Sequence, residues 1–546
     1  MRSKTELPNS VLRWQAFFLC LILFLVSFLL FRPIISAFED LHIEYLLSGG
    51  YGDSRDLRLH YLYGWHPFVF APVYLLYGWM PETNWYGIFL ILVQFIAHLI
   101  LINQLIRRVG FKKTYPIYLV FFFLFGFPFL QKLEIATTSS LLALAACSKF
   151  IFTYSNQQDQ DLPISTKNKV FFILSLVFAS LLRFHTTFLV LAIFSLASIF
   201  LLNRRSLKQF LMAGLISLVV SPILFQVQKL IYQQEPDYAI WKAKSDLYFS
   251  MTNRPNTEFV PVDSFQKMEA SFILQHYWVD SSMITVQNLK PFIRSEIFSI
   301  NSSSSTPQKA FFWIFQNNRL SLLLIITLLA ASFLLGGRIA FLKSFVIIGI
   351  GLSTFLSLLI LFKIREHLIL TISSFIFLCI LGVLISDLGK KGKILGYLVF
   401  GVFMSIGCWR LVQVMKSATT LNSQITKTKT LINSCSESPE KLFINPSNEG
   451  WMALSAFDSP RRFPLKNVLT RELLMTGKFI PLFERFQVFH LTNQLVDNPR
   501  IVLLGARQPD WRLYYLLKKD KTINVQASSV LPEIPAFVLK THYPGD

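Results

Sequence analysis

The feature that most constrains this chain is its series of long apolar runs. A helix needs ~20 mainly apolar residues to cross the hydrocarbon core of a bilayer. About eleven segments reach or approach that length, near residues 15–36, 85–106, 114–130, 135–153, 169–182, 186–202, 209–231, 319–335, 339–362, 367–386 and 394–415. These runs predict an all-α polytopic membrane protein, a bundle of about eleven transmembrane helices.

Composition excludes the main soluble classes. Hydrophobic residues make up 53% of the 546 residues and charged residues only 15%, whereas ordinary globular chains carry about 25% charged residues. So few charges cannot cover an aqueous surface, which excludes a soluble enzyme, a disordered scaffold and a fibrous protein. The first apolar run, from Phe17 to about Ile35, is too long for a signal peptide, and no small-x-small site follows it. We expect a retained first helix.

The net charge of +21 comes mainly from short loops between the apolar runs. On one side of the predicted membrane these loops carry Arg107, Arg108, Lys112, Lys113, Lys167, Lys169, Arg204, Arg205, Lys208, Arg338, Lys390, Lys391 and Lys393. Basic loops stay on the cytoplasmic side. The pattern therefore predicts a cytoplasmic N-terminus and an extracytoplasmic C-terminus in a cell membrane, such as a bacterial inner membrane. Because topology accounts for the charge, we expect no nucleic-acid partner.

The long segments then fall on the outer side. We predict a transmembrane module over residues 1–415 with outer loops at 37–84 and 232–318, and a small extracytoplasmic α/β domain over 416–546. Two short apolar runs in that domain, Lys441–Asn445 and Arg500–Leu504, have the character of strands. A long loop without strong regular pattern is usually functional or disordered. We expect part of the loop 232–318 to cover an active site.

Cysteine and histidine spacing gives little sign of a cofactor. The five cysteines contain no CxxC pair, so the sequence implies neither a disulfide framework nor a zinc site. Six of the nine histidines fall on the predicted outer side, but no HxxxH or HxH spacing occurs. We predict no cofactor and keep a divalent metal as the alternative.

Charged side chains gather at the outer membrane surface of this topology. Glu39 and Asp40 follow the first helix, and the other members sit in very short connections between helices: Lys132, Glu134, Arg183, His185, Lys363, Arg365, Glu366 and His367. Basic residues there oppose the positive-inside bias, so they need a local reason. Snorkelling accounts for one such residue, but less well for a collection of carboxylates, guanidinium groups and imidazoles.

This set suits transfer of a group from a lipid-linked phosphate. A carboxylate accepts the proton of an attacking hydroxyl, and Arg or Lys binds the phosphate. We assign catalysis to Asp40 and Glu39, the donor phosphate to Arg365, Lys363, Arg183 and His367, and further substrate contacts to His42, His66, Glu134 and His185. Adjacent residues of a helix point in different directions, so only one carboxylate of the pair faces the acceptor. We favour Asp40 as the base, and Glu39 remains the alternative.

Several of these motifs resemble the GT-C superfamily of polytopic glycosyltransferases. Glu39-Asp40-Leu41-His42 and His66-Pro67-Phe68 resemble the acidic pair and the loop-closing element of its protein O-mannosyltransferase and aminoarabinose transferase branches. Ser48–Gly52 with Asn84-Trp85-Tyr86 resembles a less characterised bacterial group, and Ile364–Leu368 resembles the element that holds the lipid phosphate. Here Glu precedes Asp in the pair, where the family usually has Asp first.

The resemblance implies an inverting transferase that moves a sugar from a polyprenyl-phosphate donor to a hydroxyl of a glycan, lipid or protein acceptor, in cell-envelope or polysaccharide biosynthesis. It covers the first ten predicted helices and leaves the C-terminal domain unassigned. Two alternatives stay open. A polysaccharide polymerase or ligase acts on similar lipid-linked glycans. A lipid-linked sugar transporter or flippase would carry its substrate without cleaving a bond.

Overall fold

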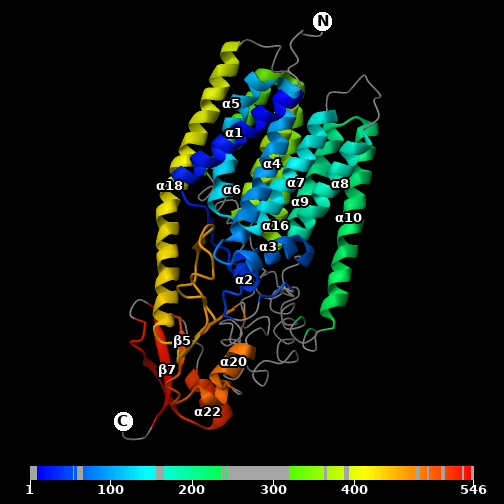
Figure 1. The fold of residues 1–546 in the computed structure, drawn as a ribbon. Coiled ribbons are helices and arrows are strands. Elements are labelled where there is room, and N and C mark those ends of the chain that lie inside the picture. Colours follow the sequence, from blue (N-terminus) through cyan, green and yellow to red (C-terminus); the bar gives the residue numbers. More distant parts are fainter. Residues whose placement is uncertain are drawn as a thin grey trace.

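The structure is a computed structural model that describes residues 9–52, 55–57, 66–154, 165–234, 238, 242, 319–361, 366–385, 393–471, 473, 480–488, 491–505, 511–531 and 534–542. The predicted fold class is confirmed: a bundle of long apolar helices carries a small α/β domain at one end (Figure 1). The first described helix of the chain begins near the opposite end of the bundle (Figure 1). Most of the predicted outer loop 232–318 lies outside the described residues.

The helices of the bundle follow the apolar runs closely. They are α1 (Asn9–Leu30), α4 (Trp85–Val109), α5 (Phe111–Phe121), α6 (Phe127–Gln131), α7 (Ile135–Tyr154), α8 (Thr166–Leu182), α9 (Phe184–Leu201), α10 (Arg204–Tyr232), α15 (Arg319–Ala331), α16 (Gly337–Leu361), α17 (Glu366–Ile385) and α18 (Lys393–Ser436). A π-helical turn, Phe122–Gly126, joins α5 to α6. Helix α7 lies at the centre, against α4, α8, α9 and α17. Its alanines and serines allow this close packing.

Nine helices of the described chain are long and apolar enough to cross a membrane. One of these stretches, Arg319–Leu358, has 40 residues and reverses direction within its length. The Oγ atoms of Ser332 and Ser344 lie 2.8 Å apart, whereas twelve residues of straight helix would separate them by ~18 Å. Gly337, at φ +74°, begins the returning helix α16. The number of eleven membrane crossings and the side on which each terminus lies stay predictions.

The predicted loop 37–84 contains two helices. Helix α2 (Phe38–Ser48) carries the acidic pair in its first turn, and α3 (Pro67–Trp79) is short and apolar. The side chains of Phe68, Leu75 and Trp79 on α3 are more than half exposed, which suits a helix that lies in the membrane interface. Both helices lie between the bundle and the C-terminal domain (Figure 1).

The C-terminal domain contains a five-stranded sheet in the order β4-β2-β5-β7-β6. Its strands are β2 (Leu442–Asn445), β4 (Val468–Thr470), β5 (Ile501–Leu504), β6 (Ile523–Ala527) and β7 (Ala536–Thr541). Strand β2 pairs in parallel with β4 and with β5. Strand β7 pairs antiparallel with β5 and with β6. Strands β2 and β5 match the two predicted runs, and both are fully buried. The short helices α20 (Ile480–Phe486), α21 (Leu491–Gln494) and α22 (Trp511–Lys519) accompany the sheet.

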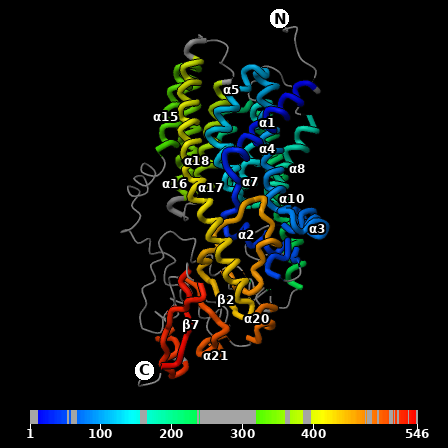
Figure 2. Tube along the Cα trace, turned by 60° about the vertical axis from the view of Figure 1, so that its left-hand side comes forward, coloured from blue at the N-terminus to red at the C-terminus, as the bar shows by residue number. Residues whose placement is uncertain are grey.

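Helix α18 runs without interruption from the bundle into this domain (Figure 2). Its 44 residues correspond to ~66 Å, about twice the thickness of a hydrocarbon core. The backbone N–H of Met452 donates to the hydroxyl of Thr428 on α18 at 2.9 Å, and the amide of Asn467 donates to the carbonyl of Cys435 at 2.8 Å. The expected boundary near residue 415 therefore falls inside a continuous helix that supports both parts.

Candidate functional site

A short strand fixes the position of the acidic pair. Residues Ile34 and Ile35 form β1, which pairs antiparallel with Leu454 and Ser455 of β3. The carbonyl of Ile34 also accepts a hydrogen bond from the N–H of Leu133 at 2.8 Å. The chain between α1 and α2 is thus bonded to the C-terminal domain on one side and to the connection between α6 and α7 on the other. This arrangement holds the start of α2 beside residues 134 and 135.

Asp40 lies in the first turn of α2 and is only 2% exposed. Its Oδ1 accepts hydrogen bonds from the Tyr86 hydroxyl at 2.5 Å and from the N–H of Ile135 at 2.8 Å. Burial raises the pKa of Asp40 to about 8; the Tyr86 hydrogen bond opposes this shift, and the charge of Glu134 adds to it. A carboxyl group with a pKa near neutrality is suited to act as a general base.

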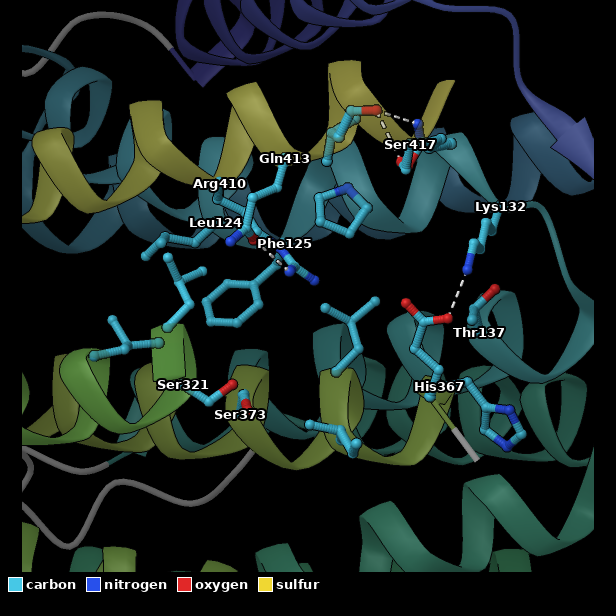
Figure 3. A pocket seen from close by; sticks show the side chains of 18 of the residues that line it. Leu124, Phe125, Lys132, Thr137, Ser321, His367, Ser373, Arg410, Gln413 and Ser417 are labelled. Carbon is cyan, nitrogen blue, oxygen red and sulfur yellow. Dashed lines mark hydrogen bonds and ion pairs between the residues drawn. The ribbon is translucent and has the colours of Figure 1, made fainter. Parts of the chain in front are cut away.

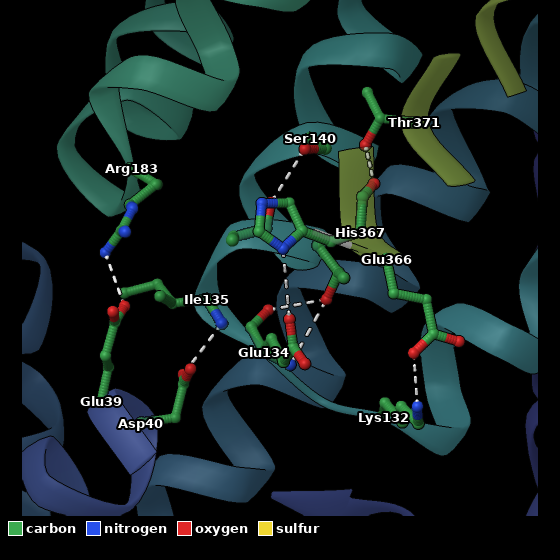
Figure 4. Close-up of polar contacts among 12 residues, drawn as sticks. Glu39, Asp40, Lys132, Glu134, Ile135, Ser140, Arg183, Glu366, His367 and Thr371 are labelled. Atoms are coloured by element: carbon green, nitrogen blue, oxygen red, sulfur yellow. Dashed lines mark hydrogen bonds and ion pairs between the residues drawn. The ribbon is translucent and has the colours of Figure 1, made fainter. Parts of the chain in front are cut away.

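Glu39 points in a different direction from Asp40. Its Oε2 lies 3.1 Å from Nη1 of Arg183, the residue between α8 and α9 (Figure 4). Both side chains are largely buried, at 16% and 14% exposed. The ion pair fixes the direction of the Glu39 side chain, away from that of Asp40. Arg183, which we expected at the donor phosphate, has a carboxylate partner within the protein instead.

Two further ion pairs join the α6–α7 connection to the start of α17. Nδ1 of His367 lies 3.7 Å from Oε2 of Glu134, and Nζ of Lys132 lies 2.6 Å from Oε2 of Glu366 (Figure 4). All four residues were predicted to lie at one membrane surface. Two segments that are far apart in sequence, residues 132–134 and 366–367, therefore meet beside the acidic pair.

These residues enclose a cavity of about 320 Å³, which we call the carboxylate pocket. Its charged and titratable lining residues are Glu39, Asp40, Glu134, Arg183, Glu366, His367 and Arg471. Arg471 comes from the C-terminal domain, directly after β4. Its guanidinium carbon lies 5.1 Å from the centre of the Phe38 ring, and its backbone N–H donates to Oδ1 of Asn448 at 3.1 Å. The C-terminal domain therefore forms part of the pocket wall.

A second cavity of about 630 Å³, the basic pocket, adjoins the first. Its basic lining residues are Lys132, Arg319 and Arg410, from three different segments. Figure 3 shows Lys132 and Arg410 on opposite parts of the pocket wall. Its apolar walls consist of Leu124, Phe125, Pro128, Leu320, Leu324, Ile369, Leu370, Trp409 and Val414. The two pockets share Glu134, Glu366 and His367. Basic groups beside apolar walls suit a ligand with an anionic head and a hydrocarbon chain.

Three predicted substrate contacts lie elsewhere. His42 is fully buried, with Nδ1 2.8 Å from the hydroxyl of Tyr51. His66 is the N-cap of α3, and its Nε2 lies 3.1 Å from the carbonyl oxygen of Leu224; burial lowers the pKa of His66. His185 is exposed in the first turn of α9. None of these three histidines is among the described residues that line either pocket.

Lys363 and Arg365 lie outside the described residues, so their expected contact with a donor phosphate stays a prediction. Among the described side chains, no group of three His, Cys, Asp or Glu residues is arranged to hold a metal ion. Sequence reasoning missed Arg319, Arg410 and Arg471. The sequence could have indicated Arg410, because a charged residue within an apolar span usually marks a functional site. Arg471 carried none, because only the docking of the domain brings it to the pocket.

The sequence matches no protein-family model and no curated protein. Two solved structures of ArnT from Cupriavidus metallidurans are similar to this chain. The structure bound to undecaprenyl phosphate has a TM-score of 0.40 and 11% identity, and the match covers 96% of this chain and 97% of that one. The apo structure has a TM-score of 0.38 and 12% identity, with 95% and 96% covered.

Proposed function

We propose that this protein is a membrane glycosyltransferase that moves a sugar from a polyprenyl-phosphate donor to an acceptor hydroxyl. One observation carries the proposal: a buried carboxyl group lines a pocket that adjoins a second pocket with basic residues and apolar walls. The first pocket supplies a proton acceptor, and the second supplies charge and a hydrocarbon surface. Transfer from a lipid phosphate needs both at adjacent positions.

The donor occupies the basic pocket. Its phosphate lies among Lys132, Arg319 and Arg410, and its hydrocarbon chain follows the apolar wall toward Leu324. Positive groups arranged in advance around a leaving phosphate stabilise the charge that develops as the bond breaks. The sugar then extends past the shared residues, of which His367 is one, toward Asp40. Lys363 and Arg365, next to His367 in sequence, would add to the same phosphate site.

Asp40 is the base of the proposed reaction. The acceptor hydroxyl gives its proton to the Asp40 carboxylate, and its oxygen bonds to the anomeric carbon of the sugar. The bond between that carbon and the phosphate oxygen breaks, and the lipid phosphate leaves with the electron pair. A single displacement of this kind inverts the configuration at the anomeric carbon. Glu39, paired with Arg183, contributes charge beside the base rather than a proton site.

The test is release of lipid phosphate by the purified full-length chain in proteoliposomes. A panel of polyprenyl-phosphate sugars, offered with glycan, lipid and peptide acceptors, should contain a donor that is cleaved with transfer of its sugar. Asp40→Asn keeps the shape of the side chain but accepts no proton, so this variant should bind the same donor without cleaving it. Asp497→Asn, at an exposed carboxylate of the C-terminal domain, is the control and should be as active as the wild type.

Transport of the lipid-linked sugar across the vesicle without cleavage would contradict the transferase and favour a flippase. Elongation of a lipid-linked glycan chain would instead favour a polymerase. An Asp40→Asn variant that still cleaves the donor at the wild-type rate would remove Asp40 as base.

We further propose that both pockets open at the outer face of the cell membrane. A cysteine at Glu440, which is exposed before β2, should react with an impermeant thiol reagent from outside, in a chain whose exposed Cys408 is replaced by serine. The matched control is a cysteine at Lys112, which is exposed in the first turn of α5. This position should lie on the cytoplasmic side and stay unlabelled from outside. Labelling of Lys112→Cys from outside, with Glu440→Cys protected, would reverse the proposed topology.

A further inference from the structure

The first turn of α4 holds two carboxyl groups of α2. Asp40 and Glu44 are four residues apart, so they lie on the same face of that helix. The Tyr86 hydroxyl donates to Oδ1 of Asp40 at 2.5 Å, and the amide of Asn84 donates to Oε1 of Glu44 at 2.5 Å. Tyr86 and Asn84 are two residues apart at the start of α4. Helix α2 is therefore attached to α4 at two points, one helical turn apart.

These contacts are buried and connected to one another. Glu44, Asn84 and Tyr86 are each no more than 1% exposed. The hydroxyl of Tyr77 donates to Oδ1 of Asn84 at 3.1 Å and accepts from the backbone N–H of Tyr86 at 3.2 Å. A buried and interconnected network of this kind is rigid, because each member lacks an alternative partner in water.

The C-terminal domain closes this network from the other side. The amide of Asn84 donates a second hydrogen bond to the carbonyl of Asp458 at 3.1 Å. Gly87 lies so close to the domain that a Cβ atom there would be 2.2 Å from the carbonyl oxygen of Ala456. The start of α4 is thus held between α2 and the domain.

The consequence for Asp40 is a fixed orientation of its carboxyl group. Among the described residues, the hydrogen bonds to Asp40 come from Tyr86 and Ile135, and both end on Oδ1. The other oxygen of the Asp40 carboxyl group is Oδ2, and Asp40 lines the carboxylate pocket. Two anchors one turn apart also fix the rotation of α2 about its axis. Holding a reacting group in one geometry is a major part of its catalytic effect.

We infer that Tyr86 is a positioning residue that acts through Asp40, by holding Oδ1 so that Oδ2 receives the proton of the acceptor hydroxyl. The inference rests on the proposed function, which makes Asp40 the base. The pair formed by Asn84 and Glu44 is the second anchor of the same arrangement.

The inference predicts how the charge state of Asp40 responds to Tyr86. A hydrogen bond that is donated to a carboxylate favours its charged form and lowers its pKa. The other titratable groups on the elements packed around Asp40 are Glu39, Glu44, Glu134, Arg183, Glu366, His367 and Arg471. They are unchanged in a Tyr86→Phe variant, so any shift in the titration of Asp40 reports the lost hydroxyl.

The experiment measures this titration directly and through the reaction. Infrared difference spectra of the full chain in lipid vesicles follow the C=O band of the protonated Asp40 carboxyl, which Asp40→Asn identifies by its loss. The midpoint should lie at about 8 in the wild type and about one pH unit higher in Tyr86→Phe. With the donor that supports turnover, kcat/KM at pH 7 should fall about tenfold. Binding of the donor should not change.

Two further variants separate the outcomes. Tyr118→Phe removes another buried hydroxyl, 2.5 Å from Nδ1 of His98, and should leave the Asp40 midpoint unchanged. The amino acid 3-fluorotyrosine, placed at position 86 alone, keeps the hydrogen bond with a more acidic donor and should move the midpoint downward. This second variant also answers the question if Tyr86→Phe fails to fold.

An unshifted midpoint in both Tyr86 variants, while Asp40→Asn is inactive, would overturn the inference and leave the proposed function intact. Shifted midpoints in a protein that transfers no sugar would contradict the proposed function and leave the contact between Tyr86 and Asp40 established.

Discussion

The carboxylate pocket and the basic pocket share three residues but are built in different ways. The carboxylate pocket is formed by chain connections and the C-terminal domain, and its central residue, Asp40, is almost fully buried. The basic pocket lies between α6 with its preceding π-helical turn and the helices α15, α17 and α18, and most of its wall is apolar. One is fixed by hydrogen bonds, and the other by the packing of apolar side chains.

This difference separates two chemical tasks. Burial raises the pKa of a carboxyl group and makes it a better base, which is the situation of Asp40. A phosphate on a hydrocarbon chain needs positive charge beside an apolar surface, which is the situation around Arg319 and Arg410. Glu134, Glu366 and His367 border both pockets, so a ligand can reach from one to the other.

The largest expected effect distinguishes the two adjacent carboxylates. Asp40→Asn should lower the transfer rate by ~10²–10⁴, the usual loss when a general base is removed. Glu39→Gln should be the milder change, because it breaks the ion pair with Arg183 but leaves the proton acceptor in place. Single-turnover transfer rates of the two variants, each compared with the wild type, measure the two losses. The opposite order, an inactive Glu39→Gln beside a nearly normal Asp40→Asn, would exchange their roles.

A smaller effect is expected at Arg410 in the basic pocket. Arg410→Ala should weaken donor binding by about 10- to 100-fold, in line with the loss of a charged hydrogen bond of ~1.5–3 kcal/mol. Lysine should restore part of the affinity, because it keeps the charge but not the planar two-pronged donor. Equilibrium binding of the lipid phosphate measures the loss. The pH at which Asp40 titrates should stay at its wild-type value, and a change there would mean that the two pockets are not independent.

The smallest expected effect concerns a residue of the shared border. The negative charge of Glu134 contributes to the raised pKa of Asp40, so Glu134→Gln should lower that pKa. Activity depends on the deprotonated form of Asp40, which predominates above its pKa, so the acid limb of the pH–rate profile should move to lower pH. The shift should be below about one unit, because burial is the larger cause. A limb that moves upward would show that Glu134 acts on Asp40 through structure rather than charge.

The sequence by itself determined the membrane class, the helices and the neighbourhood of the site. An apolar run of about 20 residues has few folds other than a buried or membrane-spanning helix. Once the helices alternate across a membrane, residues at the ends of distant helices must share one surface. Glu39, Asp40, Glu134, Arg183 and His367 were predicted to lie together for that reason, and they line one pocket.

Tertiary structure decided which side chains of that neighbourhood meet. His42, His66 and His185 satisfied the same sequence argument, yet they lie elsewhere: His42 contacts Tyr51, His66 caps α3, and His185 is exposed on α9. Arg471 reaches the pocket only because the C-terminal domain docks against α2 and α4. Hydropathy and charge fix the depth of a residue in the membrane, but the direction of a side chain depends on the rotation of its helix and on contacts with residues far away in sequence. In α2 that rotation is set by Tyr86 and Asn84, which is why only the folded protein separates Asp40 from Glu39.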